Sequence, residues 1–352
     1  RGNLTISDDT ILGSNALISG TGIIITNKTD IIKYMNTYNG TYTLNNITLS
    51  GSRRNYGNLT IINSILNTTL YNTGNLTIIN CTMSNMYNNL TYGGSSFTGL
   101  LRNDGGNLII INSTLTNNSA KSIKSVNVIY NDGNLTITNT ILNNNKIGCI
   151  RSDYSNKEKL INVTNTIFNN NSNGNIFVPV TNVLINLYNS TFIHSSSNNI
   201  NSSVSSVYIA STNHTIINNC TFRNNSIIVT GQYSIYDASG AALRVNGYYS
   251  TINNTIFENN YIQYNSSWAT SGGAAIAGSG IRNLTLTNCI FKDNNMSSVK
   301  GIYMPGYLID NRYSGSGADL CMYMYQGNCL IENNTFTNSY ASGFAGSVFI
   351  NS

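Results

Sequence analysis

The sequence predicts an all-β fold, a parallel β-helix (β-solenoid) of roughly a dozen irregular coils with loop insertions. Three observations predict it. One short phrase recurs along the chain, apolar residues within each copy are two apart, and each copy carries an asparagine at one place in the pattern. Together they indicate a bent strand unit that stacks on further copies of itself.

The recurring phrase is clearest at residues 133–144, Gly-Asn-Leu-Thr-Ile-Thr-Asn-Thr-Ile-Leu-Asn-Asn. Versions of it stand at 57–66, 74–83 and 283–291. Leu135 and Ile137 are two residues apart, which is the period of a strand, and Leu142 ends a second short run. Asn139 separates the two runs, and asparagine readily takes the left-handed conformation of a sharp bend.

Bend asparagines of this kind can be followed along the chain. They are Asn63, Asn80, Asn112, Asn139, Asn165, Asn189, Asn219, Asn254, Asn288 and Asn333. Successive positions differ by 17 residues (63 to 80) at the least and by 45 (288 to 333) at the most, which indicates one coil per copy with insertions in the loops. Stacked coils align these residues, so we expect an amide ladder along the axis.

One large apolar residue follows each bend. These residues are Leu66, Met83, Leu115, Leu142, Phe168, Phe192, Phe222, Phe257, Phe291 and Phe336. We expect them to form an interior core column, in which the phenyl rings stack with an offset.

A chain of 352 residues ordinarily suggests two or three domains. The repeat favours one elongated domain, in which residues 1–56 form atypical N-terminal coils or a partial cap, and residues 57–352 form the β-helix repeats continuous with them. Two prolines and 40% apolar residues favour ordered strands over disorder. Because the first residue is Arg rather than Met, we expect the chain to be processed or excerpted from a longer one.

The six cysteines do not form an obvious framework. Cys81, Cys220 and Cys289 each follow a bend asparagine, where buried small hydrophobic residues are a better interpretation than disulfides. Cys321 and Cys329 are eight residues apart in the longest insertion. A disulfide between these two and a pair of free thiols remain equally open.

An Asn-x-Gly turn precedes the clearest copies, and we expect its glycine to supply a positive φ. The turns are Asn55-Tyr56-Gly57, Asn72-Thr73-Gly74, Asn103-Asp104-Gly105 and Asn131-Asp132-Gly133. Asp104 and Asp132 could hold calcium or act as an acid–base pair, as stacked carboxylates do in polysaccharide-cleaving β-helices. Tyr56 and Thr73 stand at the equivalent positions, so the turn needs no carboxylate and a structural role is favoured.

Catalytic chemistry is not predicted. A polysaccharide-cleaving β-helix needs two or three acids with Arg or Lys on one face, and the 13 acids of the sequence do not assemble such a face. His194 and His214 lack the spacing of a zinc site and are expected to be exposed loop residues. No nucleophile elbow or phosphate-binding loop is found. We therefore expect no catalytic, cofactor-binding or metal-binding residue and no enzyme.

Charge and hydropathy exclude two further classes. The net charge of +5 comes from Lys and Arg that are not gathered into one stripe, which disfavours nucleic acid as a partner. Apolar runs stay below the 18 or so residues of a membrane span, so we expect no membrane insertion by this segment.

Sequons for N-glycosylation are dense. Glycans at every coil would crowd one another at a spacing of about 4.8 Å. We therefore expect glycosylation at the loop positions Asn67, Asn89, Asn201 and Asn265 in preference to bend positions such as Asn112 and Asn219. The loop tyrosines, among them Tyr233, Tyr236, Tyr248, Tyr249, Tyr261 and Tyr264, could stack on sugar rings or on a neighbouring subunit, or could merely cover the sides of the solenoid.

Two longer phrases carry a resemblance. Residues 222–225 (Phe-Arg-Asn-Asn) are followed by 239–243 (Ser-Gly-Ala-Ala-Leu), and 257–260 by the similar 272–276. This pairing resembles the repeats of chlamydial polymorphic outer-membrane proteins. The Asn-Leu-Thr-Ile motif more closely resembles the repeats of adhesin-like surface proteins of methanogenic archaea. Over most of residues 57–350 the resemblance implies a right-handed parallel β-helix outside the cell, with no catalytic residues to carry over.

The expected function is that of an extracellular, cell-surface structural or adhesin-like glycoprotein, a fibre or sheath component or an adhesion module. Residues 343–350 indicate a further strand without a cap, so self-association end to end or side by side is expected, with a cell-surface glycan or host-cell receptor as a further partner. The alternative is a carbohydrate-active β-helix enzyme or tailspike-like depolymerase. A non-catalytic carbohydrate-binding module is the third hypothesis.

Overall fold

The computed structural model describes residues 4–5, 17–18, 21–25, 36–37, 41–46, 48–88, 98–121, 126–153, 157–180, 182–198, 205–210, 214–229, 240–264, 271–298, 314–341 and 346–351. Within these ranges the regular structure is all β-strand, without a helix, so the predicted all-β class is confirmed. The chain divides into two compact units. Unit 1 is Arg1–Asp153 with Lys159–Ile167, and unit 2 is Tyr154–Glu158 with Phe168–Ser352.

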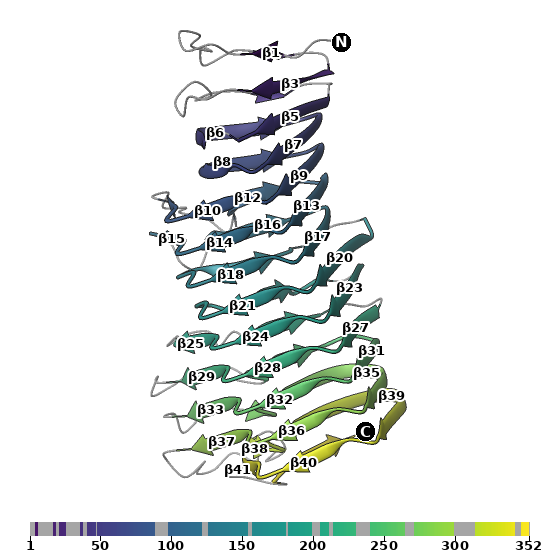
Figure 1. Cartoon of the computed structure of the whole chain (residues 1–352). Helices are drawn as coiled ribbons and strands as arrows, with labels where there is room; N and C mark the ends of the chain where they lie inside the picture. Colours follow the sequence, from purple (N-terminus) through teal and green to yellow (C-terminus); the bar gives the residue numbers. More distant parts are fainter. Residues whose placement is uncertain are drawn as a thin grey trace, which may run out of the picture. The chain divides into compact units, whose positions relative to one another are not determined.

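In unit 1 the strands form parallel stacks, which we name A to D (Figure 1). In a coil that has all four, the chain visits them in the order A, B, D, C. Stack A holds β1 (Leu4–Thr5), β3 (Thr21–Ile25), β5 (Thr41–Asn45), β7 (Asn58–Ile62), β9 (Asn75–Ile79), β13 (Asn107–Ile111), β17 (Asn134–Thr138) and β20 (Lys159–Thr164). Stack B holds β10 (Thr82–Ser84), β14 (Thr114–Thr116) and β18 (Ile141–Asn143). Stack C holds β2 (Leu17–Ile18), β4 (Asn36–Thr37), β12 (Thr98–Asn103), β16 (Val126–Asn131) and β19 (Gly148–Arg151). β6 (Thr48–Asn55) and β8 (Ile65–Asn72) run through B and C, and stack D is β11 (Tyr87–Asn88) with β15 (Ser119–Ala120).

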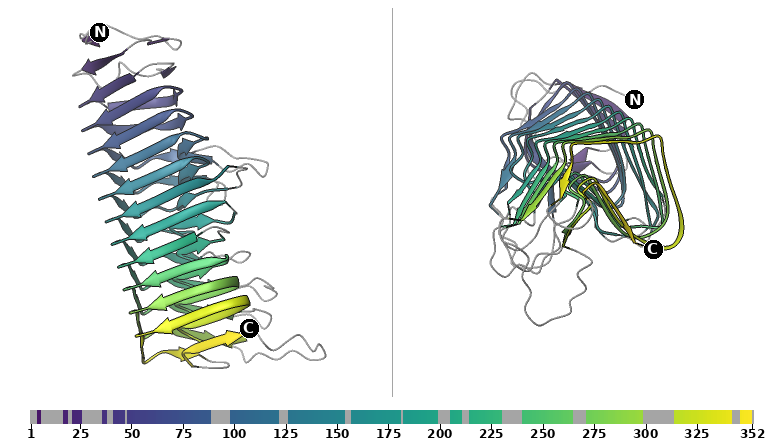
Figure 2. Two further views of the ribbon diagram at one scale, coloured as in Figure 1. Left: turned by 90° about the vertical axis from the view of Figure 1, so that its right-hand side faces the viewer. Right: turned by 90° about the horizontal axis from the view of Figure 1, so that it is seen from below.

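Unit 2 is built in the same way (Figure 2). Its stack A holds β23 (Val183–Tyr188), β27 (His214–Asn218), β31 (Tyr249–Asn253) and the second halves of β35 (Ile276–Thr287) and β39 (Leu320–Glu332). Stack B holds β21 (Ile167–Asn169, starting at the unit boundary), β24 (Thr191–Ile193), β28 (Thr221–Arg223), β32 (Ile256–Glu258), β36 (Ile290–Lys292) and β40 (Thr335–Thr337). Stack C holds β22 (Ile176–Val178), β26 (Val207–Ile209), β30 (Leu243–Val245), the first halves of β35 and β39, and β42 (Val348–Asn351). Stack D holds β25 (Ser196–Asn198), β29 (Ser226–Val229), β33 (Tyr261–Tyr264), β37 (Asn295–Ser298) and β41 (Tyr340–Ala341), and β34 (Ser271–Gly272) pairs with β38 (Ser314–Ser316).

These parallel, in-register stacks confirm the predicted parallel β-helix. Coils take part in it before residue 57 as well, because Thr41 pairs with Asn58 and Thr21 with Thr41 in stack A. The partial cap predicted for residues 1–56 remains a prediction.

The core lies between the stacks, where alternate side chains of each strand point inward. Leu135, Ile137 and Leu142 are fully buried, as the strand period predicts. The predicted column is also found. In unit 1, Leu66, Met83, Leu115 and Leu142 are buried, and in unit 2 the rings from Phe168 to Phe336 stack in sequence with centroids 4.7–5.0 Å apart and planes within 10°. Phe336, the last ring, is only half-buried.

The ten bend asparagines all have a positive φ, between 49° and 54°, so the predicted bend is confirmed. Their amides lie on the outside of the solenoid and form the expected ladder only in part. Asn80 donates from Nδ2 to Oδ1 of Asn63 (3.2 Å), and Asn219 donates likewise to Asn189 (2.8 Å). Asn254 instead donates to Oδ1 of Asn218, the residue before a bend.

A second bend follows five residues after the first, and the sequence analysis did not predict it. Its residues also have a positive φ, between 51° and 56°; they are Asn85, Asn117, Asn144, Asn170, His194, Asn224, Asn259, Asp293 and Asn338. Two left-handed residues five apart leave room for one short strand between them. This spacing sets the length of the stack B strands.

The continuous amide ladders are buried, and they lie beside these bends. In unit 2, Asn225, Asn260 and Asn294 are completely buried. Nδ2 of Asn225 donates to Oδ1 of Asn260 and to the carbonyl of Phe192 (3.0 and 2.9 Å), and Asn260 repeats this toward Asn294 and Phe222 (both 3.0 Å). Each amide thus joins its own coil to both neighbours.

Unit 1 contains a second buried ladder at the Asn-x-Gly turn. Asn55, Asn72, Asn103 and Asn131 are linked in sequence by Nδ2 to Oδ1 bonds of 2.7 Å. The expected positive φ is wrong for most of the turn glycines, because only Gly105 has one, at 84°. Close stacking explains why Gly74 and Gly133 are glycine: a Cβ on Gly74 would lie 2.2 Å from the carbonyl oxygen of Gly57, and one on Gly133 would lie 2.0 Å from that of Gly106.

One of the two cysteine predictions is confirmed and the other is wrong. Cys81, Cys220 and Cys289 are buried, as expected, and each also donates from Sγ to backbone carbonyls, for example Cys81 to Ile79 at 3.2 Å. Burial raises the pKa of the Cys220 thiol to about 12, so it stays protonated. The Cys321–Cys329 disulfide is wrong: both lie eight residues apart on the single strand β39, Cys321 buried and Cys329 exposed, and no disulfide joins them.

Substitution of a ladder asparagine should cost far more stability than substitution of a bend asparagine. Asn260→Ala removes the partners of Asn225, Asn294 and the Phe222 carbonyl, and we expect it to lower the free energy of unfolding by about 3 kcal/mol. Asn254→Gly keeps the left-handed φ and should cost less than about 1 kcal/mol. Urea unfolding followed by far-UV circular dichroism compares the two; equal midpoints would contradict the distinction.

Asp319 generates a pH prediction. It is completely buried in unit 2, where Oδ1 accepts hydrogen bonds from Nδ2 of Asn294 (2.8 Å) and Oγ of Ser339 (2.6 Å). Burial raises its pKa above 3.8, against hydrogen bonds that lower it. The stability from the protonated carboxyl is therefore complete below the unfolded-state pKa and is lost as pH rises through the folded-state pKa.

Asp319→Asn keeps an acceptor for Asn294 and Ser339 and removes the buried charge. We expect its unfolding midpoint to exceed that of the unmodified chain at neutral pH and the difference to vanish below about pH 4. Thermal unfolding across this pH range measures it. A difference that does not change with pH would show that Asp319 does not titrate in this way.

Candidate functional site: an arginine–tyrosine–aspartate column

Arginine and tyrosine alternate on the outer side of stack C in unit 1. The register pairs Arg54 with Tyr71, Tyr71 with Arg102, Arg102 with Tyr130, and Tyr130 with Arg151. Each of these residues comes directly before the turn, so the strand places all five side chains on one face. The strand spacing of about 4.8 Å brings each guanidinium against a ring.

The guanidinium groups stack on the tyrosine rings. Cζ of Arg102 is 5.3 Å from the ring centroid of Tyr71 and 5.2 Å from that of Tyr130, and Cζ of Arg54 is 5.4 Å from the Tyr71 centroid. Such cation–π contacts contribute roughly 0.5–1 kcal/mol each at partly exposed sites. The column therefore stabilises the coils that it crosses.

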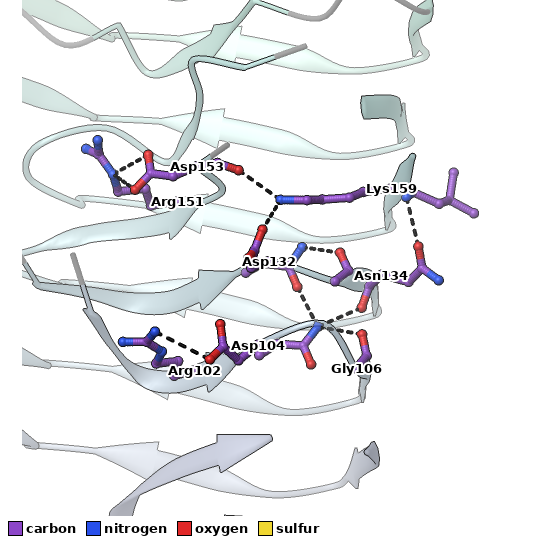
Figure 3. A network of polar contacts seen from close by, with 12 residues as sticks. Arg102, Asp104, Gly106, Asp132, Asn134, Arg151, Asp153 and Lys159 are labelled. Atoms are coloured by element: carbon purple, nitrogen blue, oxygen red, sulfur yellow. Dashed lines mark hydrogen bonds and ion pairs between the residues drawn. The ribbon is translucent and has the colours of Figure 1, made fainter. Parts of the chain in front are cut away.

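Three aspartates flank the column two residues after an arginine or tyrosine (Figure 3). Asp104 accepts from Nη2 of Arg102 (3.5 Å) and from the hydroxyl of Tyr71. Asp153 accepts from Nε of Arg151 through both oxygens (2.9 and 3.0 Å). Each of these carboxylates is held by a neighbouring cation of the same column.

Lys159 closes the arrangement at Asp132. Its side chain is only 2% exposed, and Nζ donates to Oδ1 of Asp132 and to the backbone carbonyl of Asp153 (2.8 Å). A lysine buried to this degree requires such partners. It links the turns that carry Asp132 and Asp153 (Figure 3).

The tyrosines stay protonated at neutral pH. The hydrogen bond to Asp104, followed by burial, raises the pKa of Tyr71. Burial, with Asp153 and Asp132 nearby, raises the pKa of Tyr130 to about 12. Both phenols are therefore protonated, and Tyr71 donates its proton in the hydrogen bond to Asp104.

This column corrects the statement that no face unites acids with Arg or Lys. The turn pattern identifies Asp104 and Asp132 from the sequence, but it does not identify Asp153 or Lys159. A signal was present: Arg102-Asn103-Asp104, Tyr130-Asn131-Asp132 and Arg151-Ser152-Asp153 share one pattern. Only the register shows that the three tripeptides lie on successive coils. No cluster of His, Cys, Asp and Glu suited to a metal ion occurs among the described residues.

Unit 2 carries a smaller charged ladder on stack B. Glu258 lies between Arg223 and Lys292 in the register and contacts both, at 2.7 and 3.5 Å. The side chains of Arg223 and Lys292 are each 48% exposed, so water screens these pairs. Opposite charges on adjacent strands support the register without forming a reactive site.

The structure bears only in part on the predicted glycosylation sites and on the two histidines. Asn67 is exposed, as a glycosylated residue must be, but it lies in strand β8 and not in a loop. Asn89, Asn201 and Asn265 lie outside the described residues. Asn112 and Asn219 are exposed at their bends, and the choice between the two groups stays a prediction. Both histidines are exposed, as expected. His194 lies in a bend between β24 and β25, which agrees with the loop assignment, but His214 begins β27, so that assignment is wrong for His214.

Comparisons with protein-family models, with curated proteins and with solved structures find no match for this chain. The resemblance to methanogen adhesin-like proteins and to chlamydial outer-membrane repeats therefore stays a prediction. Within the described residues, no helix reaches the length and hydropathy that a membrane span requires.

Lys159 offers a test of the column. Lys159→Met leaves the Asp132 carboxylate without its cation, and we expect a loss of about 2 kcal/mol in the free energy of unfolding because Asp132 keeps some contact with water. Lys292→Met, which removes an exposed cation, should cost less than about 0.5 kcal/mol. Denaturant titration of both variants makes the comparison; a Lys159 variant as stable as the Lys292 variant would refute the structural role.

Proposed function

We propose that this chain is a non-catalytic, adhesin-like β-solenoid of the cell surface, acting as a fibre or sheath component or as an adhesion module. One observation carries the proposal: the stacked carboxylates of unit 1, Asp104, Asp132 and Asp153, are each paired with a cation of their own column. An acid held in this way stabilises coils. It is poorly placed to exchange protons with a substrate.

The interactions between the coils and the composition of the surface also support a scaffold role. Asparagine ladders join the coils within each unit, stacked phenyl rings do so in unit 2, and only 9% of the residues are charged. A surface of neutral amides and hydroxyls depends little on salt or pH, because few groups titrate or are screened. Such a surface suits a protein exposed to the medium.

The partners that we propose are further copies of the chain, end to end or side by side, and a cell-surface glycan or host-cell receptor. The last described coil leaves apolar side chains partly uncovered. Phe336 and Val348 are half-buried and Ile350 is 40% exposed, whereas their register partners Phe291, Leu320 and Met322 are completely buried. A further coil would cover these side chains.

Immunogold labelling of intact cells that make the protein tests the location. We expect label on the outside without permeabilisation, and elongated assemblies in negative-stain micrographs of the purified chain at high concentration. Label that appears only after permeabilisation would contradict the surface role, and isolated particles at every concentration would contradict self-association.

A carbohydrate-active enzyme or depolymerase is the second candidate, because three aspartates lie with Arg102, Arg151 and Lys159 on one face. Coil spacing of about 4.8 Å is close to the carboxyl separation of retaining glycosidases. We expect no release of reducing ends from a panel of polysaccharides. Release that Asp132→Asn abolishes, in a variant that still folds, would replace the scaffold proposal by this one.

A further inference from the structure

Unit 2 presents a group of exposed aromatic residues where the chain passes from stack C to stack A. Tyr248 directly precedes β31, Tyr249 begins it, and Tyr325 lies on β39, with exposed fractions of 37%, 48% and 56%. Arg282 of β35 stands between them in the stacking order and is exposed as well. We call Tyr248, Tyr249, Arg282 and Tyr325 the corner patch.

Arg282 is held between two rings of the patch. Its Cζ is 4.3 Å from the ring centroid of Tyr248 and 5.8 Å from that of Tyr325. The backbone N–H of Arg282 donates to the carbonyl of Tyr248 (3.2 Å), which fixes β35 against β31 at this point. The guanidinium is therefore held over both rings, and the Arg282 side chain is still exposed to solvent.

The corner has an irregular backbone that creates this arrangement. The register of β35 with β39 shifts twice, between Ser279 and Asn283. Gly280 takes a φ of 68°, and a Cβ on Gly327 would lie 1.5 Å from the carbonyl oxygen of Arg282, so glycine is required there. The extra residues of β39 opposite Arg282 carry Tyr325 outward.

Polar groups surround the aromatic rings. Asn246 accepts from the backbone N–H and the hydroxyl of Ser279 (3.1 and 3.2 Å), and Asn283 accepts from the N–H of Asn328 (3.3 Å). The ring of His214 lies 6.3 Å from that of Tyr249 on the neighbouring coil. Amides and a histidine beside exposed rings offer donors and acceptors for hydroxyl groups.

The charge of the patch differs from that of the column in unit 1. Among the described residues Arg282 forms no ion pair, whereas Arg102 and Arg151 each bind an aspartate. On β30, β31, β35 and β39 the only carboxylate is Glu332, at the far end of β39. The edge of Arg282 is thus left for a carboxylate from outside.

We propose that the corner patch binds an acidic polysaccharide, one whose sugars carry carboxylates. Tyrosine faces stack on sugar rings, the guanidinium of Arg282 binds a carboxylate through two parallel hydrogen bonds, and neighbouring amides bind hydroxyl groups. Three successive coils contribute Tyr248, Arg282 and Tyr325 at a coil spacing of about 4.8 Å, which is close to the advance of an extended polysaccharide per sugar. It deepens the proposed adhesion role by naming the ligand class, and rests on that role only for access to the outside.

Binding of the purified full chain to immobilised polygalacturonate tests the proposal by interferometry. We expect Tyr248→Ala and Arg282→Ala each to weaken binding about tenfold, and Arg282→Lys to weaken it as well, since lysine lacks the planar fork. Tyr340→Ala, which removes a 58% exposed tyrosine from β41, is the control and should bind normally. Far-UV circular dichroism verifies the fold of each variant.

Three further probes separate the alternatives. Carboxyl-reduced polygalacturonate should bind about tenfold more weakly, because it has no charge for Arg282. Polyglutamate and a single-stranded oligonucleotide should bind more weakly than polygalacturonate. Equal binding of polyglutamate would reduce the patch to a charge effect, tighter binding of the oligonucleotide would make it a nucleic-acid site, and failure to bind polygalacturonate, alginate and hyaluronan would overturn the proposal.

These measurements use purified protein, so they do not depend on where the chain resides in the cell. Surface labelling without polysaccharide binding would contradict the proposed ligand but not the scaffold role. Polysaccharide binding without surface labelling would contradict the proposed location but not the binding site.

Discussion

The buried asparagine amide is the interaction on which the stacked coils depend. A parallel β-solenoid joins its strands by backbone hydrogen bonds, but the corners between strands leave backbone groups without such partners. Asn260 supplies them: it donates to the Phe222 carbonyl and to Asn294, and accepts from Asn225. Because an amide is both donor and acceptor and carries no charge, the ladder can continue through the core of unit 2 without an ionic desolvation cost.

The stacking of coils also determines which residue types recur at the bends and in the short strands between them. Left-handed bends five residues apart, such as Asn254 and Asn259, admit a three-residue strand whose middle side chain, Phe257, must point inward. At nine of the ten first bends the next residue is small and donates to the carbonyl two positions before it, and Asn334 is the exception. Thr255 does so through Oγ1 at 2.8 Å and Cys289 through Sγ at 3.2 Å, which explains why serine, threonine and cysteine interchange there.

Charge is used sparingly and in two ways. In unit 1, Arg102, Asp104 and Lys159 belong to a column whose cations and carboxylates neutralise one another beside tyrosine rings. In unit 2, Arg282 also lies between tyrosines but meets no carboxylate among the described residues. The same arginine–tyrosine stacking therefore stabilises coils in one setting and, in the other, leaves a cation ready for a ligand.

The sequence by itself determined the parallel β-solenoid, the first bend and the core column, because these follow from local periods of two residues and from one asparagine per coil. It did not determine which asparagines form the continuous ladders, since Asn254, Asn259 and Asn260 have the same side chain and only burial distinguishes them. Nor did it determine the column of Asp104, Asp132 and Asp153 or the corner patch. Loops of unequal length separate those residues along the chain, and only the register of stacked coils brings them onto one face.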